Sequence, residues 1–206
     1  LEYEVENLSN EELEVSIAAF VRNTVGNDGK MTGFTWRRLT RTSGEKDNRT
    51  VYCEGSNLKG IMCLSDGVET NSTAWGTFAL STSETKANIS YKTKCAENSW
   101  RRTILEFWDD LTDDGELKSI ENEEKTTPHG ALCVKKIINA KSKEPFKFAF
   151  TWNFPNRQAW EDEKTIVGNW YSKHYRDAWD AALKIVPRLK ELEKRSLAFT
   201  RKIAAL

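Results

Sequence analysis

The sequence predicts a mainly β protein: an antiparallel β-sandwich with one short inserted helix and a long C-terminal helix. Short apolar runs follow one another through residues 1–155, separated by Gly, Asn and Asp. This spacing is typical of an antiparallel sandwich and not of β-α-β units. After residue 167 the apolar period changes to that of a helix. We therefore expect a sandwich at 1–155, followed by a connector and long helix at 156–206.

The strand predictions rest on apolar side chains at every second position. Leu1, Tyr3 and Val5 alternate with glutamates, and a second alternating run covers 13–21. Residues 37–50 are polar and interrupted by glycine, so we expect a long exposed loop there. Further strands are predicted at residues 50–55, 61–65, 74–81, 88–92 and 130–140.

The clearest strand pattern ends at Pro155. Aromatic side chains occupy every second position of this run, at Phe146, Phe148, Phe150, Trp152 and Phe154. Five aromatic groups on one face would bury a large apolar area. We therefore expect all five to face the core, from a strand at the centre of a sheet.

Two segments have helical spacing. Apolar residues at 100, 104, 107, 108 and 111 predict a short amphipathic helix over 98–111, which Asp113-Asp114-Gly115 should end. The second helix is expected to start at Asn169 or Ser172, since either side chain could cap it, and to continue to Leu206. Pro187 should kink or split it.

One face of this last helix carries an apolar seam. Its members recur at gaps of four and three residues: Ile185, Leu189, Leu192, Ser196, Phe199, Ile203 and Leu206. A seam of this length has to be covered, and we expect most of the covering surface to lie outside this sequence. The chain also opens within a strand pattern. Both observations predict a piece of a larger protein.

Composition narrows the function classes. The chain has 31 Lys+Arg and 31 Asp+Glu, so its net charge is zero and no basic surface for nucleic acid or anionic membranes is expected. The mean hydropathy is −0.65, and no apolar run approaches the ~20 residues of a membrane span. Gly-rich phosphate loops and clustered metal ligands do not occur, so we expect no cofactor and no metal.

The four cysteines are widely spaced, without a C-x-x-C pair. They are Cys53, Cys63, Cys95 and Cys133. We expect reduced and mostly buried thiols, which favours a cytoplasmic setting but leaves the compartment open.

Several phrases of the sequence resemble one known family. They are Val5–Arg22, Phe107–Asp110 with Asp114-Gly115 behind it, Phe148–Pro155, Val167–Tyr171 and Tyr175–Asp180. Together, and in this order, they are similar to the N-terminal domain of glycoside hydrolase family 116, which contains β-glucosidases and non-lysosomal glucosylceramidases. The loops at 37–50 and 116–128 carry none of this likeness.

The resemblance implies a sandwich, truncated at its start, that packs on a helical toroid of the same polypeptide. The long helix would lead from one to the other. It also implies a parent enzyme that cleaves β-glucosidic bonds of a glucoside substrate with retention. In that family the catalytic Glu and Asp belong to the toroid, so no residue of this chain is expected to be catalytic.

Candidate catalytic groups within the chain have simpler interpretations. Asp109-Asp110 and Asp113-Asp114 are paired acids, as a glycosidase requires, but acids followed by glycine are typical of a solvated helix end. The charged run at 161–163 should also be solvated. His129 and His174 have no Cys or Ser partner at a revealing spacing, so a nucleophile–base pair is unsupported.

The remaining site candidates are aromatic residues near the start of the last helix: Trp170, Tyr171, Tyr175 and Trp179. We favour packing of the helix base against the sandwich or the absent toroid. A sharper alternative is that one ring reaches the wall of a sugar-binding cleft. For the whole chain, two alternatives to a supporting domain remain: a stand-alone carbohydrate-binding module, or a structural domain that forms a homo-oligomer through its helix.

Overall fold

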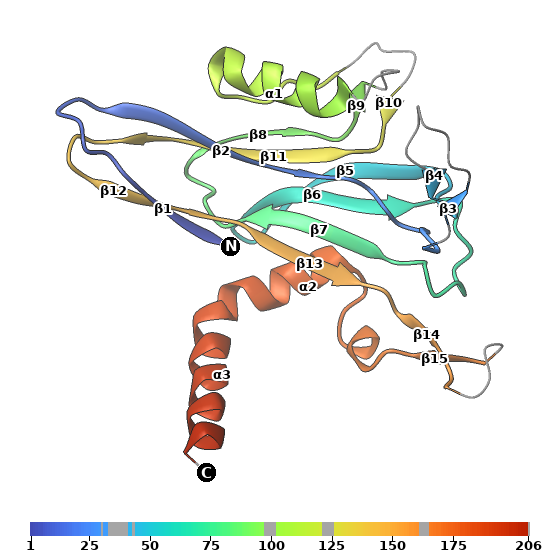
Figure 1. Ribbon diagram of the computed structural model, residues 1–206. Coiled ribbons are helices and arrows are strands. Elements are labelled where there is room, and N and C mark those ends of the chain that lie inside the picture. The colour runs from blue at the N-terminus through green and yellow to red at the C-terminus, as the bar shows by residue number, and fades with distance from the viewer. Residues whose placement is uncertain are drawn as a thin grey trace.

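The computed structural model describes residues 1–29, 31–32, 41–42, 44–96, 102–120, 126–160 and 165–205. Two antiparallel sheets face each other, with helix α1 (Arg102–Asp114) outside one sheet and α2 (Ala178–Ile185) outside the other (Figure 1). The predicted fold class, an antiparallel β-sandwich with a short inserted helix and a long C-terminal helix, is confirmed.

The first sheet has the strand order β2-β11-β8, formed by β2 (Leu13–Val21), β11 (Gly130–Ile138) and β8 (Asn88–Lys92). The second has the order β13-β7-β6-β5. Its strands are β13 (Ala149–Asn153), β7 (Thr77–Thr82), β6 (Leu58–Ser65) and β5 (Asn48–Gly55). All pairs in both sheets are antiparallel.

Four two-stranded ribbons extend these sheets. They are β1 (Glu2–Glu6) with β12 (Lys143–Lys147), β3 (Met31–Thr32) with β4 (Arg41–Thr42), β9 (Cys95–Ala96) with β10 (Thr126–Thr127), and β14 (Asn156–Gln158) with β15 (Ile166–Gly168). β5 begins at Asn48, inside the loop predicted at 37–50, and β4 also falls within it; residues 37–40 and 43 lie outside the described residues.

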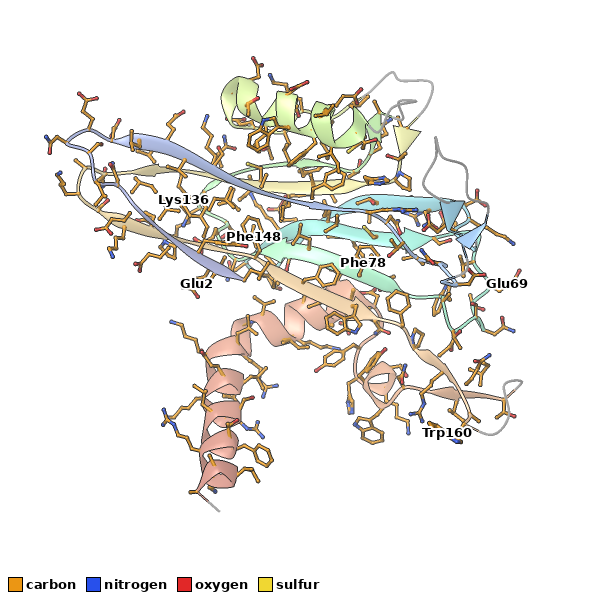
Figure 2. The ribbon with its side chains drawn as sticks, viewed as in Figure 1. Glu2, Glu69, Phe78, Lys136, Phe148 and Trp160 are labelled. Carbon is orange, nitrogen blue, oxygen red and sulfur yellow. The ribbon has the colours of Figure 1, made fainter. Side chains whose placement is uncertain are left out.

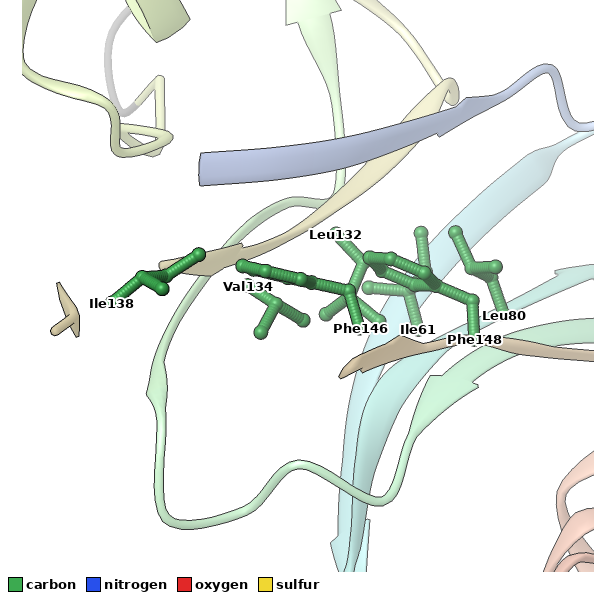
Figure 3. Packing of buried hydrophobic residues seen from close by; sticks show 7 residues of the cluster. All are labelled: Ile61, Leu80, Leu132, Val134, Ile138, Phe146 and Phe148. Atoms are coloured by element: carbon green, nitrogen blue, oxygen red, sulfur yellow. The ribbon is translucent and has the colours of Figure 1, made fainter. Parts of the chain in front are cut away.

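The main core fills the space between the two sheets (Figure 3). Its fully or nearly fully buried members are Ile61, Leu80, Leu132, Val134, Ile138, Phe146 and Phe148. Each such side chain contributes about 1.5–3 kcal/mol when it is removed from water. A separate cluster joins Phe107 and Leu111 of α1 to Ala131 and Cys133 of β11. Burial of apolar side chains therefore stabilises the packing of the two sheets on each other and of α1 on the first sheet.

The prediction that five aromatic residues face the core is wrong for two of them. Phe146 and Phe148 are buried, whereas Phe150 is 47% and Trp152 60% exposed. The segment is also two strands, because β12 pairs with β1 and β13 pairs with β7, with Phe148 between them. β13 lies at the edge of its sheet, not at the centre, so its aromatic face extends past the covering sheet.

The short helix runs from Arg102 to Asp114, and Gly115 ends it with a positive φ of 76° and a bond from its N–H to the Leu111 carbonyl. This is the predicted end. The expected start at 98–101, including Trp100, lies outside the described residues. Ile104 and Trp108 are exposed, so only part of the predicted apolar face packs inward.

The C-terminal helix is divided into several pieces. A 3-10 turn, η1 (Trp170–Lys173), precedes α2, and a second turn, η2 (Val186–Arg188), joins α2 to α3 (Leu189–Ala204). Pro187 lies in η2, so the predicted split is confirmed. The predicted start is wrong, because neither Asn169 nor Ser172 caps α2; Asp177 does. Leu206 lies outside the described residues.

Candidate interface at the C-terminal helices

Helix α2 is fixed to the outer face of the second sheet by small side chains and hydrogen bonds. Ala178 and Ala182 are fully buried, which lets the helix backbone approach β13 and β7 closely. Thr151 Oγ1 of β13 donates to the Ala178 carbonyl at 2.8 Å, and the Ala178 N–H donates to Thr77 Oγ1 of β7 at 2.8 Å. These threonines are the partners of backbone groups in the first turn of the helix, so the helix start has a defined position on the sheet.

Tyr171 anchors the turn that precedes α2. Its hydroxyl donates to the Phe154 carbonyl and accepts from the Phe154 N–H at 3.2 Å. The Asn169 amide donates to the same carbonyl at 2.8 Å. Both polar groups of the Phe154 backbone, just after β13, are therefore bound by the turn. Tyr171 thus holds the turn before α2 against the end of β13.

The other predicted aromatic residues differ in exposure. Trp170 is 71% exposed; the Lys173 ammonium lies 4.8 Å from its ring centre, and the His174 ring lies 5.4 Å away. Tyr175 is partly buried, and its carbonyl accepts from the Asn153 side chain at 2.8 Å. Trp179 is partly buried in the first turn of α2. The structure thus brings Trp170, Tyr171 and Tyr175 around one turn, with Trp170 facing solvent.

Two aspartates order the start of α2. Asp177 accepts from the Asp180 N–H at 2.7 Å as the helix N-cap. Asp180 is nearly buried, accepting from Lys184 Nζ at 2.7 Å and from the Arg176 N–H at 3.1 Å. These bonds, that with Lys184 foremost, lower the pKa of Asp180. Their contribution to stability is therefore present above the ordinary pKa of the carboxyl and is lost as the pH falls through its lowered value.

Helix α3 projects from the sandwich (Figure 1). Leu189, Phe199 and Ile203 of its apolar seam are exposed, Phe199 to 67%, and Leu192 is partly buried. Leu197 adds a further exposed apolar side chain. A groove of about 480 Å³ lies where η2 and α3 leave the sheet, with Pro187, Leu189, Phe148 and Ala149 among its lining residues. The segment that directly follows α2 therefore carries a large exposed apolar surface.

A comparison with family models matches residues 1–192 to the family described as "beta-glucosidase 2, glycosyl-hydrolase family 116 N-term". The match covers both sheets, α2 and the beginning of α3. The chain belongs to this family. The predicted resemblance is therefore confirmed, and a glycoside hydrolase parent follows from the family.

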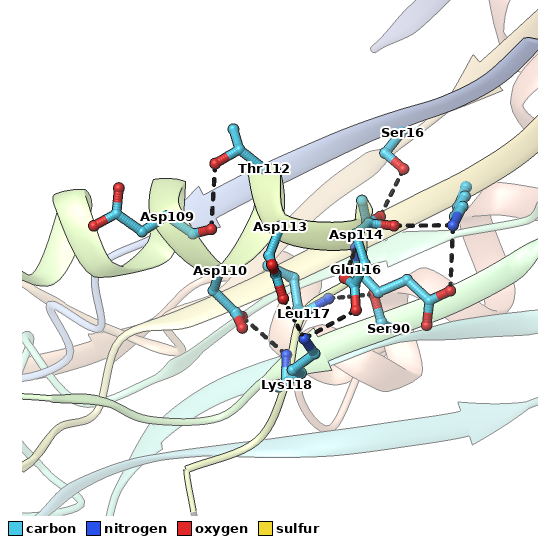
Figure 4. A network of polar contacts seen from close by, with 12 residues as sticks. Ser16, Ser90, Asp109, Asp110, Thr112, Asp113, Asp114, Glu116, Leu117 and Lys118 are labelled. Carbon is cyan, nitrogen blue, oxygen red and sulfur yellow. Dashed lines mark hydrogen bonds and ion pairs between the residues drawn. The ribbon is translucent and has the colours of Figure 1, made fainter.

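In this family 116 domain the paired acids near α1 form structural contacts (Figure 4). Asp110 accepts from the Lys118 N–H at 2.9 Å and pairs with the nearly buried Lys92 ammonium at 2.9 Å. Lys118 Nζ lies 2.9 Å from both Asp113 and Asp114. These contacts lower the pKa of Asp114, the opposite of what a catalytic general acid needs. The simpler interpretation of a helix end thus describes this cluster.

Of the remaining nucleophile and base candidates, Cys95 lies next to His129. Its thiol donates to the backbone carbonyl of His129 at 3.8 Å, and the buried Nδ1 of the His129 ring has no hydrogen-bond partner among the described residues, so the two do not form a nucleophile–base pair. Burial raises the pKa of Cys63 to about 12 and of Cys95 to about 11, which keeps both thiols protonated and unreactive at neutral pH. Burial also lowers the pKa of His129, which lies against Phe20. Residues 161–164, which include the charged connector, lie outside the described residues.

Within the described ranges, no helix of the family 116 domain is long and apolar enough to cross a membrane. The same residues contain no group of three or more His, Cys, Asp or Glu placed to hold a metal ion. Sequence reasoning missed the Asp177 cap, although an acidic residue three positions later, at Asp180, is part of a recognised N-terminal signature. It also missed the exposure of Trp152 and Trp160, which no periodicity reveals.

Replacing the helix cap tests how much α2 depends on it. Asp177→Ala leaves the Asp180 N–H in the first turn of α2 without its side-chain acceptor, and we expect a loss of about 1 kcal/mol in the free energy of unfolding. Asp177→Asn keeps the acceptor and should lose only a fraction of that. Urea denaturation of both variants measures the difference, and equal losses would contradict the role of the cap.

The Lys92–Asp110 pair gives a second test. Asp110→Ala leaves a nearly buried ammonium without its carboxylate, so we expect a loss of about 3 kcal/mol in the free energy of unfolding. Asp109→Ala is the matched control, because Asp109 is exposed and its replacement should change stability by at most about 0.5 kcal/mol. Guanidinium denaturation of the two variants compares them directly. If they were equally stable, the pair would have no structural importance.

Proposed function

We propose that this chain is the non-catalytic N-terminal part of a retaining, β-glucosidase-type hydrolase, and that it supports a helical catalytic domain of the same polypeptide. Residues 1–155 would form the supporting sandwich and residues 156–206 the connector and linker helix. The observation that carries the proposal is the seam of α3, whose apolar side chains follow an anchored helix but contact no described part of the sandwich closely enough to be buried. Membership of family 116 supports the same assignment.

The carboxyl groups of the described residues support the absence of catalysis. A glycosidase needs one carboxyl whose pKa is raised and a second one about 5–9 Å away across the scissile bond. The pKa values of Asp114, Asp180 and Glu191 are all lowered by neighbouring Lys or Arg side chains. Asp110, the best placed acid of the α1 cluster, is bound to Lys92 and Lys118.

The purified chain should therefore release no aryl group from aryl β-glucosides above the rate of buffer. The assay is absorbance of the released nitrophenol over several hours, with an active β-glucosidase as the positive control. Turnover that disappears in an Asp110→Asn variant would contradict the proposal, since it would assign the chemistry to this chain.

The seam can be tested in the parent enzyme. Phe199→Glu places a charge where we expect an apolar contact with the catalytic domain, and a large buried side chain contributes about 1.5–3 kcal/mol. We expect the variant parent to unfold at a lower temperature and lose activity. In the isolated chain the same change should alter stability by at most about 0.5 kcal/mol, because Phe199 is exposed there.

Ala198→Glu is the matched control, since position 198 lies about 100° around α3 from Phe199, outside the seam, and receives the same charge. Equal effects of the two substitutions on the parent would refute the seam as an interface. A stable, concentration-dependent dimer of the isolated chain in sedimentation would favour the alternative of a homo-oligomer that covers its own seam.

A carbohydrate-binding module is a second candidate, because Trp152, Trp160 and Trp170 are all at least 60% exposed. Exposed indole faces suit the apolar faces of glucose units. Titration calorimetry with glucosides and β-glucans separates the candidates: a binding module gives heat with the isolated chain, and a supporting domain does not. Among the four aromatic site residues, Trp170 is exposed enough to form the wall of a sugar-binding cleft. The Tyr171 hydroxyl is instead hydrogen-bonded to the Phe154 backbone.

A further inference from the structure

The outer edge of β13 presents backbone groups that no described strand pairs with. β13 is the last strand of its sheet, with β7 as its only neighbour among the described strands. The carbonyls of Lys147 and Ala149 accept from side chains of β7, Thr82 and Ser81, so the odd-numbered residues direct their polar groups toward β7. The N–H and C=O groups of Phe150 and Trp152 therefore point to the open side.

This open edge has defined limits. At one end Leu1 and Phe148 exchange two hydrogen bonds, of 2.8 and 2.9 Å, which places β1 beside the chain that leads into β13. At the other end Tyr171 and Asn169 bind the backbone of Phe154. Between these limits the edge covers the five residues of β13.

The side chains beside this edge form an apolar groove of about 410 Å³. Phe150, Trp152 and Phe154 line it from β13 and the residue after it, and Phe78 lines it from β7. Val21 lines it from the end of β2, and Arg22 and Thr24 add polar groups from the residues that follow. Phe78, labelled in Figure 2, comes from the strand next to β13. β2 and β13 are edge strands of the two facing sheets, so the sandwich is open along this side.

We infer that the edge of β13 is the docking site of an extended strand of the same polypeptide, joined to Leu1 and continuing the line of β1. The register of β1 with β12 fixes its pairing: each β1 residue and its partner have numbers that sum to 149, and Leu1 with Phe148 keeps that sum. The five residues directly before Leu1 would then oppose Ala149–Asn153 in reverse order.

Two features select this occupant. The strand must run antiparallel to β13 to stay in line with β1, and its last residue then lies one peptide bond from the Leu1 nitrogen. A strand of another chain would run into β1 at this point and would have to turn out of the sheet. An uncovered edge with aromatic side chains is also prone to aggregation, which natural proteins avoid by covering it.

The same register determines which positions of the added strand should carry apolar side chains. Opposed residues of an antiparallel pair share a face. The second residue before Leu1 would share the face of Phe150, and the fourth that of Trp152, so both should be apolar and fill the groove. The first, third and fifth would face the side of the sheet that carries α2.

Hydrogen exchange provides the first test, with the parent protein encoded by the gene compared with the chain that begins at Leu1. In the parent, the amides of Phe150 and Trp152 should exchange about a hundredfold more slowly, because each gains a strand partner. The Ala79 amide, inside the sheet, is the control and should be slow in both. Equal exchange of Phe150 and Trp152 in the two proteins, or a gene that encodes fewer than five residues before Leu1, would overturn the inference.

A disulfide test fixes the register in the parent. Trp152→Cys is combined with Cys at the fourth residue before Leu1, or, as the control, at the third, which faces the other side. The first pair should form an intramolecular disulfide at least about tenfold faster, because opposed residues are within disulfide reach and the control pair points apart. Equal rates would overturn the register, and disulfides formed only between molecules would show that the strand comes from another chain.

Discussion

The contact between α2 and the β13–β7 pair decides how the C-terminal helices leave the sandwich. Fully buried Ala178 lies between Thr77 and Thr151, which bind its N–H and its carbonyl. A larger side chain at this position would displace the helix from both threonines. Because α2 is only eight residues long, this contact, the Asp177 cap and the bonds to Asp180 together determine its direction. The position of η2 and α3 follows from that direction.

The two faces of β13 make different contacts. On one face, Thr151 binds α2 at the Ala178 carbonyl, and Asn153 binds the Tyr175 carbonyl in the segment before α2. On the other face, Phe150 and Trp152 extend beyond the covering sheet. This division explains why α2 is well anchored although the sandwich is open beside it. Phe146 and Phe148, which precede β13 in the chain, are the aromatic residues of this run that belong to the buried main core.

Much of the fold can be predicted from the sequence where the spacing of apolar residues is set only by burial of one face of a strand or helix. β2 and β8 occupy the predicted residues, because alternate side chains of each strand pack against the main core, such as Val15 and Ile17 in β2 and Ile89 and Tyr91 in β8. The aromatic strand shows the limit of the method: alternation identifies which side chains share a face, but the extent of the opposite sheet decides which of them are covered. Phe148 and Phe150 are therefore indistinguishable in the sequence and differ tenfold or more in exposure, 4% against 47%.

The candidate site was predictable in part for the same reason. Tyr171 and Tyr175 lie at the helix base as expected, but their partners, the Phe154 backbone and the Asn153 amide, are brought near only by the fold. Asn169 could serve as a cap in a continuous helix; in the structure its amide binds Phe154, and the cap role belongs to Asp177. The sequence identifies residues whose side chains are able to form such bonds. The tertiary structure decides which of these residues form them.

Helix α3 receives little stabilisation from the described part of the fold, since none of its residues is buried there. It has 16 residues, and isolated helices near ~12–15 residues are marginally stable in water. Its ion pairs, Arg188–Glu191 and Glu191–Arg195, are exposed to solvent and therefore screened. They lower the pKa of Glu191, so even this support is lost on acidification through that lowered value. The exposed seam is the one feature of α3 able to supply a large stabilising term, and it can do so only when another surface covers it.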